Sequence, residues 1–169
     1  WRLNCANDFP TLSFEDKTYN ECFEYQGLGT TENPYKIDSC IKLEGMASNL
    51  NAHYELISDI DCEESQYWDN SRGFMPIASN YSTVGGCPSA GLQFKGTLNG
   101  NFYKILKLKI NRANRSCIGL FARLGDGAYI KNLIIKDPSI IGNWHTGVLS
   151  GETSAFQNIT MEKVGVDNL

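Results

Sequence analysis

The sequence lacks several patterns that would assign it to a common class of protein. No stretch of its 169 residues approaches the roughly 20 apolar residues of a membrane-spanning helix. It has no C-x-x-C pair, so its cysteines do not match a zinc ribbon or a thioredoxin-type redox motif. It also has no H-E-x-x-H, G-x-S-x-G or phosphate-loop motif. No motif therefore supports a zinc protease, a serine hydrolase of that type or a nucleotide-binding protein.

Positive charge is scarce as well. The chain has 15 Lys and Arg residues and 19 Asp and Glu residues, which gives a net charge of -4. The longest basic pattern is the alternating Lys104, Lys107 and Lys109, too little for the basic face of a nucleic-acid binder. With 41% apolar and 20% charged residues, the composition is that of one ordinary globular domain, and 16 glycines against five prolines indicate many tight turns.

The sequence has no initiator Met, and Trp1, Arg2 and Leu3 do not begin a signal peptide. We therefore expect a processed product or a fragment.

Cysteines and glycosylation triplets point to an oxidising, extracellular or cell-surface location. An even number of cysteines, spread at intervals of about 15–30 residues, is typical of structural disulfides. Pairing of sequence neighbours would give the smallest loops, although the sequence alone does not fix the pairs. A reduced intracellular protein with buried thiols is the alternative. The predicted disulfide cysteines are Cys5, Cys22, Cys40, Cys62, Cys87 and Cys117, and the N-x-S/T triplets begin at Asn80, Asn114 and Asn158.

Two regions follow each other along the chain. Residues 1–28 carry two cysteines and several aromatic residues without a clear period, and we interpret them as an N-terminal extension that is tied by a disulfide or donated to a neighbour. A short connecting segment rich in glycine and threonine follows, and residues 29–169 are expected to form the main domain. Within it, apolar residues at helical spacing predict a helix over about 39–50, with Ser39 as its cap.

A weak internal repeat follows the helix. Short strand-like segments begin at Tyr103, Ile130 and Phe156, spaced about 27 residues apart, and a second column relates Ile118–Phe121 to Thr146–Leu149. Stacked coils would bury the apolar residues of such repeats and pair their backbones. The inward residues would be Leu106, Leu108, Ile110, Leu133, Ile135, Ile159 and Met161. An antiparallel sandwich is the alternative, because it too consists of short strands and turns.

An ordered set of motifs resembles a family of secreted surface proteins. The segments that carry the resemblance are GTTENPYKI at 29–37, YELISDID at 54–61, GFMPI at 73–77, FKGTLNGN at 94–101, IGLF at 118–121, AYIKNL at 128–133 and GVLSG at 147–151. They look like the right-handed parallel β-helix of adhesin-like proteins with GLUG-type repeats, over about residues 29–160. The resemblance implies an all-β solenoid with an N-terminal capping helix, and a surface-associated, adhesive role.

The chain departs from this pattern at Cys40, Cys62, Cys87 and Cys117, where the family carries no cysteine. Cys62 stands where the family has an apolar residue, so we expect an inward and bonded sulfur. Fold-level resemblance does not fix a ligand or a reaction.

No set of residues has the pattern of a catalytic or metal centre, so we predict no enzyme, metal or cofactor. Asp59, Asp61, Glu63 and Glu64 would suit calcium or acid–base work, but they also fit a solvated strand edge. The basic and acidic candidates for a polysaccharide-acting enzyme are not in register, and both histidines fit turns or the surface. These residues are Arg112, Arg123, Asp126, Asp137, His53 and His145.

Trp68 and Trp144 are candidate sugar-stacking residues, with packing in the core as the alternative. We expect a secreted, N-glycosylated, non-enzymatic structural protein that serves adhesion or assembles into an extracellular filament or layer. Its partners would be copies of itself, joined head to tail at an open end of the stack, other surface proteins, or glycans. A polysaccharide lyase or glycosidase and a carbohydrate-binding module are the alternatives.

Overall fold

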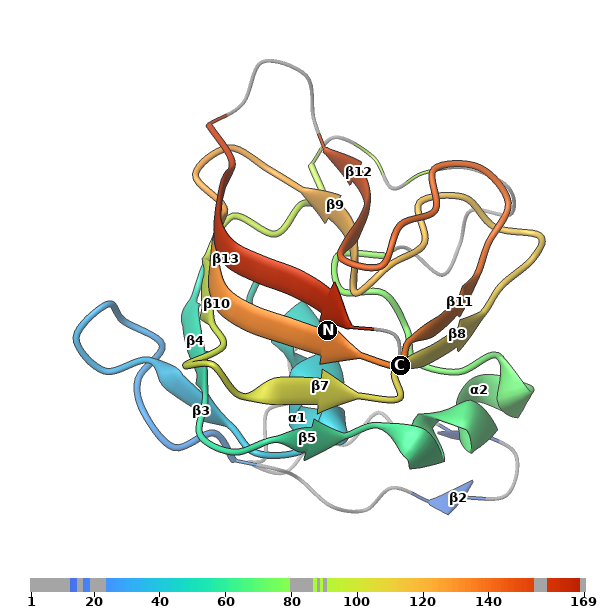
Figure 1. Cartoon of the computed structure of the whole chain (residues 1–169), viewed down its shortest axis with the longest axis horizontal. Coiled ribbons are helices and arrows are strands. Elements are labelled where there is room, and N and C mark those ends of the chain that lie inside the picture. The colour runs from blue at the N-terminus through green and yellow to red at the C-terminus, as the bar shows by residue number, and fades with distance from the viewer. Residues whose placement is uncertain are drawn as a thin grey trace.

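Short strands, most of which pair in parallel, are the main regular elements of the structure. Figure 1 shows a computed structural model, which describes residues 24–79, 87, 89, 91–153 and 158–167 and the backbone of two short N-terminal strands. The helical segments are α1 (Cys40–Gly45), η1 (Met46–Ser48), η2 (Glu63–Tyr67) and α2 (Trp68–Ser71). The strands are β1 (Ser13–Phe14), β2 (Lys17–Thr18), β3 (Tyr35–Ile37), β4 (His53–Leu56), β5 (Ile60–Asp61), β6 (Thr97–Asn99), β7 (Lys104–Leu106), β8 (Lys109–Asn111), β9 (Phe121–Leu124), β10 (Tyr129–Lys136), β11 (Ser139–Ile141), β12 (Ser150–Thr153) and β13 (Thr160–Asp167).

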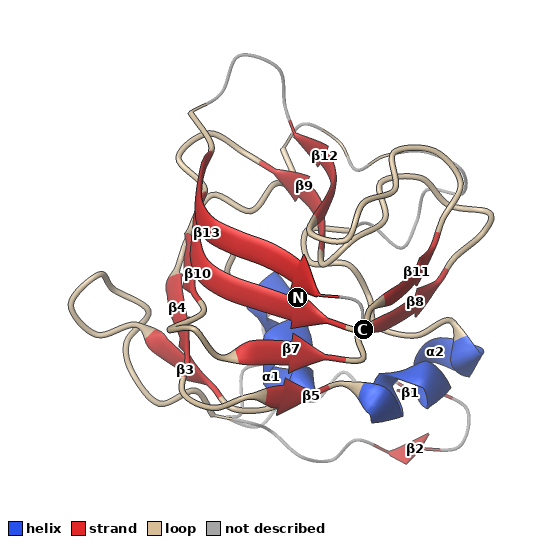
Figure 2. Cartoon of the chain, viewed as in Figure 1, coloured by secondary structure: helices blue, strands red, loops and turns tan. Residues whose placement is uncertain are grey.

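The main sheet has seven strands. Its order is β3-β4-β6-β10-β7-β5, and β13 pairs with the opposite edge of β10. Strand β10 is long enough to border β6 with its first half and β7 with its second half. Figure 2 shows β13, β10, β7 and β5 in succession, with α1 behind them. Every pairing in this sheet is parallel.

The predicted right-handed parallel β-helix with an N-terminal capping helix is wrong. Besides the main sheet, the strands form three separate two-stranded sheets, β1-β2, β8-β11 and β9-β12, and the described residues do not close into a solenoid. Between β5 and β6 the described chain supplies two short helices and single bridges instead of strands, and the bridge from Gly73 to Ile110 is antiparallel. A solenoid needs a strand from every coil in each sheet, and this segment does not provide one.

The repeated segments nevertheless lie side by side, with a register that the sequence comparison did not predict. Ile105 lies opposite Ile135, and Ile130 lies opposite Met161. The left-handed backbone of Asn132 (φ 50) interrupts the alternation of β10 and shifts the pairing. The second repeated column pairs as its alignment predicts, because Ile118 bridges to Thr146 in parallel.

Strand alternation places most of the predicted inward residues correctly, although these are only part of the core. Leu108, Ile110, Leu133 and Ile135 are fully buried, and Ile159 packs against the core from a partly buried position. Two predictions are wrong. Ile105 is buried in place of Leu106, because left-handed backbone at Lys107 (φ 53) falls between Leu106 and Leu108, and Met161 is 48% exposed.

Aromatic rings connect successive levels of the core. The centroids of Tyr25 and Tyr35 lie 5.0 Å apart, those of Tyr35 and Tyr54 5.5 Å, and those of Tyr54 and Phe94 6.3 Å. Phe121 follows Phe94 at 4.7 Å. These separations suit offset and edge contacts between rings. Tyr25 also donates its hydroxyl to the Lys42 carbonyl, at 2.6 Å, so the described residues that precede β3 pack against the main domain.

The predicted helix over about 39–50 is present in a shorter form. Ser39 stands at the N-cap position of α1, although its side chain makes no capping hydrogen bond. Leu43 and Met46 enter the core. A disulfide joins Cys40 at the start of α1 to the buried Cys62 after β5, and another joins Cys87 to Cys117. These are two of the sequence-neighbour pairs. The proposed pair Cys5–Cys22 and most of the extension 1–28 lie outside the described residues. None of the helices in the described part of the chain has the length and apolarity needed to cross a membrane.

Candidate interaction surface

Strand β13 forms one outer edge of the main sheet. It pairs with β10 from Tyr129–Thr160 to Lys136–Asp167, and no described strand pairs with its other side. Figure 1 shows β13 lying along β10 on the side away from β7. An unpaired strand edge presents backbone N–H and C=O groups that can bond to another chain.

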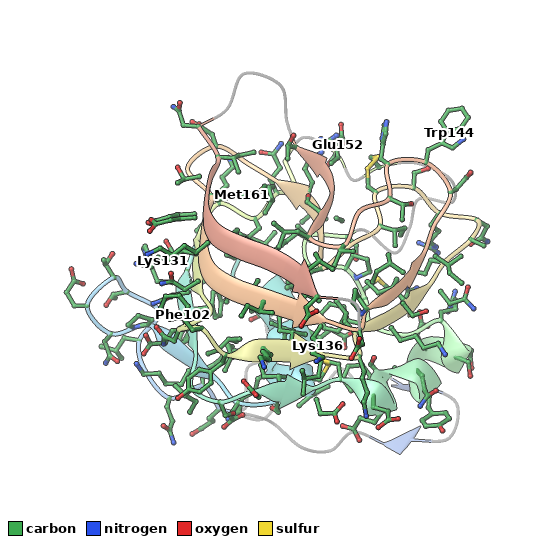
Figure 3. All side chains as sticks on the ribbon, in the orientation of Figure 1. Phe102, Lys131, Lys136, Trp144, Glu152 and Met161 are labelled. Carbon is green, nitrogen blue, oxygen red and sulfur yellow. A yellow bond between two sulfur atoms is a disulfide. The ribbon has the colours of Figure 1, made fainter. Side chains whose placement is uncertain are left out.

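Two apolar columns run across the main sheet and end on β13. In the first, Tyr54, Leu98 and Ile130 are fully buried and the next partner, Met161, is 48% exposed. Figure 3 shows Met161 on the ribbon of β13. The edge strand therefore leaves the last apolar side chain of this column partly open to solvent.

The second column ends in the same way. Ile60, Ile105 and Ile135 are buried, and Val166, which lies opposite Ile135, is 47% exposed. Between Met161 and Val166, Val164 packs against the core. We call Met161, Val164 and Val166 together with the free backbone edge of β13 the β13 edge.

The backbone contour of β13 copies that of β10. Lys163 (φ 51) adopts a left-handed bend, and its neighbours Glu162 and Val164 lie opposite Lys131 and Leu133. Bulges and charged residues can protect an edge strand from association. Here the bend at Lys163 matches the bend of Asn132, so β13 keeps the shape of a strand that already pairs in this sheet.

Charged groups on β13 are engaged within the chain. Tyr129 donates its hydroxyl to Glu162 at 2.8 Å, which raises the pKa of Tyr129 and lowers that of Glu162. Lys136 lies 3.8 Å from Asp167, and the Lys163 ammonium lies 6.0 Å from the centre of the Phe102 ring. The apolar side chains and the backbone remain the groups available to a partner.

Of the predicted glycosylation residues, Asn114 and Asn158 are exposed, and Asn80 lies outside the described residues. Asn114 follows β8, and Asn158 comes just before β13, where its backbone N–H donates to Asp126 at 3.0 Å. Glycosylation of these residues stays a prediction.

The two predicted sugar-stacking residues differ in exposure. Trp144, in the turn between β11 and β12, is 73% exposed and projects outward in Figure 3. Trp68 starts α2 and packs against the core from a half-buried position. Of the two, Trp144 presents the more accessible ring.

Three of the acidic candidates are engaged by a lysine or by a backbone N–H group. Lys107 lies 2.7 Å from Glu63 and 3.7 Å from Asp61, and Asp59 accepts the backbone N–H of Lys104 at 2.8 Å. These contacts favour a structural role of the acidic cluster. His53 lies on β4, where its ring is 3.3 Å from the Thr31 hydroxyl.

The basic candidates for catalysis are held in separate ion pairs. Arg112 is buried and lies 2.7 Å from Asp69, whose other oxygen accepts from Arg72 at 2.5 Å. Arg123 binds Glu152, its register partner on β12. Asp69 and Glu152 were not among the predicted residues, because nothing in local spacing marks residues that meet only after folding.

A carboxyl group on a half-buried side chain lies near the Arg112–Asp69 pair. Glu44 of α1 accepts the backbone N–H of Met75 at 2.6 Å. Burial raises the pKa of Glu44 to about 7, against the smaller opposing effects of the Met75 bond and of Arg112. This group is neutral over a wider pH range than an exposed glutamate.

A compact cluster of polar side chains surrounds the Cys87–Cys117 disulfide. His145 Nδ1 lies 3.3 Å from Cys87 Sγ and 3.9 Å from Cys117 Sγ. Glu152 Oε2 lies 3.2 Å from Cys117 Sγ. The sequence predicts only an ordinary turn or surface position for His145, because His145 and Glu152 are distant from both cysteines along the chain.

Two curated proteins are similar to this chain. Over 142 residues it is 34% identical to Halomucin of Haloquadratum walsbyi, an alignment that covers 80% of this chain and 2% of the relative. Over 148 residues it is 31% identical to a protein of Evansella cellulosilytica named as a Gly-rich membrane protein, covering 80% of this chain and 15% of that relative. Neither name is that of an enzyme. The chain thus spans a small part of these relatives. No protein-family model and no solved structure matches it.

Proposed function

We propose that the chain is a secreted, N-glycosylated, non-enzymatic structural unit of a cell surface, which serves adhesion or assembles into an extracellular filament or layer. The names of the two relatives, a Halomucin and a Gly-rich membrane protein, support a surface or membrane-associated structural role. The disulfides Cys40–Cys62 and Cys87–Cys117 suit the oxidising conditions outside a cell.

The β13 edge is the observation that carries the assembly part of this proposal. Two buried apolar columns end there on Met161 and Val166, about half exposed, beside a backbone edge that no described strand covers. Adding one strand to such an edge forms main-chain hydrogen bonds and buries alternate side chains. The partner that we propose is a second copy of this chain. A surface of that copy other than its own β13 edge docks on the β13 edge of the first. A contact between two different surfaces of the same molecule can propagate as a filament.

Light scattering over a concentration series tests this assembly. We expect the mean mass of the wild-type chain to increase with concentration. The double variant Met161→Lys/Val166→Lys is expected to stay monomeric, because two cations would be placed against the incoming strand. Both side chains are about half exposed, so the variant should keep its fold, which circular dichroism would verify.

Tyr67→Lys is the matched control, because Tyr67 is a 74% exposed aromatic residue on η2. It is expected to associate as the wild type does. A wild-type chain that stays monomeric at all concentrations, or a β13 double variant that associates like the control, would contradict the assembly proposal.

Carbohydrate binding is a second candidate function, favoured by the exposed ring of Trp144. An indole ring offers an apolar face that stacks on sugars and an edge that donates a hydrogen bond. Trp144→Ala would then abolish binding on a glycan array, while Trp68→Phe would leave it unchanged. An array on which the wild-type chain binds no glycan would remove this candidate.

A further inference from the structure

We propose that Cys87, Cys117, His145 and Glu152 form a Zn²⁺ site when the Cys87–Cys117 disulfide is reduced. Each residue offers one donor atom, and these four atoms lie within 4.8 Å of one another. The inference does not rest on the surface role proposed above; it concerns the reduced chain, whereas that role is argued from the intact disulfides.

The fold brings these side chains together through strand register. The bridge from Ile118 to Thr146 makes Cys117 and His145 neighbours on adjacent parallel segments. The Cys117 N–H donates to the Trp144 carbonyl, and the Ile118 N–H donates to the His145 carbonyl, both at 3.0 Å. Cys117 (φ 59) and His145 (φ 51) share a left-handed bend, so their side chains leave the backbone in similar directions.

Glu152 reaches the cluster because Gly151 allows close approach. A Cβ atom on Gly151 would overlap the backbone of Cys117 and Ile118. The absent side chain lets β12 lie directly against the bend, and the Glu152 carboxylate then extends to Cys117 Sγ. Figure 3 shows Glu152 on β12.

The donor set matches the chemistry of zinc. Two thiolates, one imidazole and one carboxylate are all ligands of Zn²⁺, which binds four of them in a tetrahedron. Zinc–ligand bonds of the usual length place neighbouring donor atoms about 3.5 Å apart. The distances from Cys87 and Cys117 Sγ to His145 Nδ1, and from Cys117 Sγ to Glu152 Oε2, range from 3.2 to 3.9 Å.

Local charge also suits a divalent cation. Two thiolates and the Glu152 carboxylate carry three negative charges, and Zn²⁺ together with the neighbouring Arg123 guanidinium carries three positive charges. Arg123 Nε lies 3.1 Å from Glu152 Oε2, so it would fix the orientation of the carboxylate ligand. Cys40 and Cys62 differ, because no comparable group of donors among the described residues includes either of them.

The disulfide and the metal exclude each other, because both use the same sulfur atoms. A thiol or phosphine reductant supplies two electrons, the S–S bond breaks, and each sulfur takes one proton as the reductant is oxidised. Binding of Zn²⁺ then displaces the two thiol protons.

Titration of the full chain with Co²⁺, a coloured substitute for zinc, tests the site. The reduced chain is expected to bind one Co²⁺ with the near-ultraviolet absorption of cobalt–thiolate bonds, and Zn²⁺ should displace it. The chain with intact disulfides is expected to give no such absorption.

Variants separate this site from the other cysteines. His145→Ala changes an exposed side chain and is expected to weaken binding at least about 100-fold, beyond the usual effect of removing an outer partner. Arg123→Ala should weaken it about 10–100-fold. His53→Ala is the matched control and should bind as the wild type does.

Circular dichroism covers the case in which reduction unfolds the chain. Zn²⁺ is then expected to restore the fold of the wild type and of His53→Ala, but not of His145→Ala. A reduced chain that binds no Co²⁺, or His145→Ala binding that equals the wild type, would overturn the proposal.

Discussion

Charged side chains in the interior depend on a few specific partners. Arg112 lies 1% exposed between Asp69 and the carbonyl of Gly73, which accepts from Arg112 Nη2 at 3.1 Å. Asp69 is itself nearly buried and has a left-handed backbone (φ 50). A buried ion pair adds little net stability, but removal of one partner leaves an uncompensated charge.

Asp69→Ala is therefore expected to lower the free energy of unfolding by about 3–5 kcal/mol. Arg72→Ala removes the outer, half-exposed partner of Asp69 and should cost about 1 kcal/mol or less. Urea unfolding of the two variants measures the difference. Equal losses would show that Arg112 does not depend on Asp69.

Glu44 gives stability a pH dependence of definite sign. Its pKa is about 7 in the folded chain against 4.5 as the ordinary value, so the unfolded chain loses this proton first as pH rises. The contribution of Glu44 to stability is therefore complete below pH 4.5 and declines by about 3 kcal/mol as pH rises to about 7. The groups that face it are the Met75 N–H, Arg112 and Asp69.

Glu44→Gln should remove this decline while keeping the shape of the side chain. The measured quantity is the difference in unfolding free energy between wild type and variant at several pH values from 4 to 8. A difference that does not change with pH would show that the Glu44 carboxyl titrates normally.

At the scale of strands and turns, close backbone approach depends on glycine. A Cβ atom on Gly96 would overlap the carbonyl oxygen of Ala52, in the turn that leads into β6. Gly165 on β13 has no neighbour within 4 Å of such an atom. Gly96, just before one strand of the main sheet, and Gly165, on another strand of it, form a matched pair.

Gly96→Ala is expected to destabilise the chain by about 1–3 kcal/mol, because the backbone must move to admit the methyl group. Gly165→Ala should stabilise it by about 0.4–1 kcal/mol, because it restricts the unfolded chain without a clash. Thermal unfolding of both variants measures the two effects. A neutral Gly96→Ala would show that the segments do not approach so closely.

Sequence periodicity predicts these elements only where alternation is unbroken. Leu133 and Ile135 are separated by one residue and both point inward, as the period of two requires. Left-handed bends at Lys107 and Asn132 shift the pattern elsewhere. Lys gives no sign of such a bend, and Asn adopts it more often than most residues but at few of its positions, so neither bend can be placed from the sequence. The Asp69–Arg112 ion pair cannot be predicted from the sequence for another reason, because its two residues meet only in the tertiary fold.

For the molecule as a whole, local sequence patterns also fail to predict the architecture, and this is why the predicted β-helix is wrong. Repeats can show that segments lie side by side, and Ile118 and Thr146 do so. They do not show what the intervening chain builds, and residues between β5 and β6 form helices and bridges where a solenoid needs strands. The β13 edge could not be predicted in detail either, because its exposure depends on which strand comes last in the sheet.

Disulfides link separate parts of the molecule, and their loss should differ by location. Replacing both Cys40 and Cys62 by Ala is expected to lower the free energy of unfolding by about 2–4 kcal/mol, because the unfolded chain is no longer cross-linked. The replacement also leaves a cavity beside α1, which adds to the loss. Replacing Cys87 and Cys117 removes a loop constraint of similar size, but Cys87 is only half-buried. Denaturant unfolding should therefore show the larger loss for the Cys40–Cys62 pair, and the reverse order would contradict this packing.

Hydrogen exchange of β13 at low and high protein concentration tests the central claim most directly. If copies of the chain add to the β13 edge, amides of Thr160–Asp167 should exchange more slowly at high concentration, while those of β8 should not change. Exchange across β13 that is independent of concentration would contradict the account.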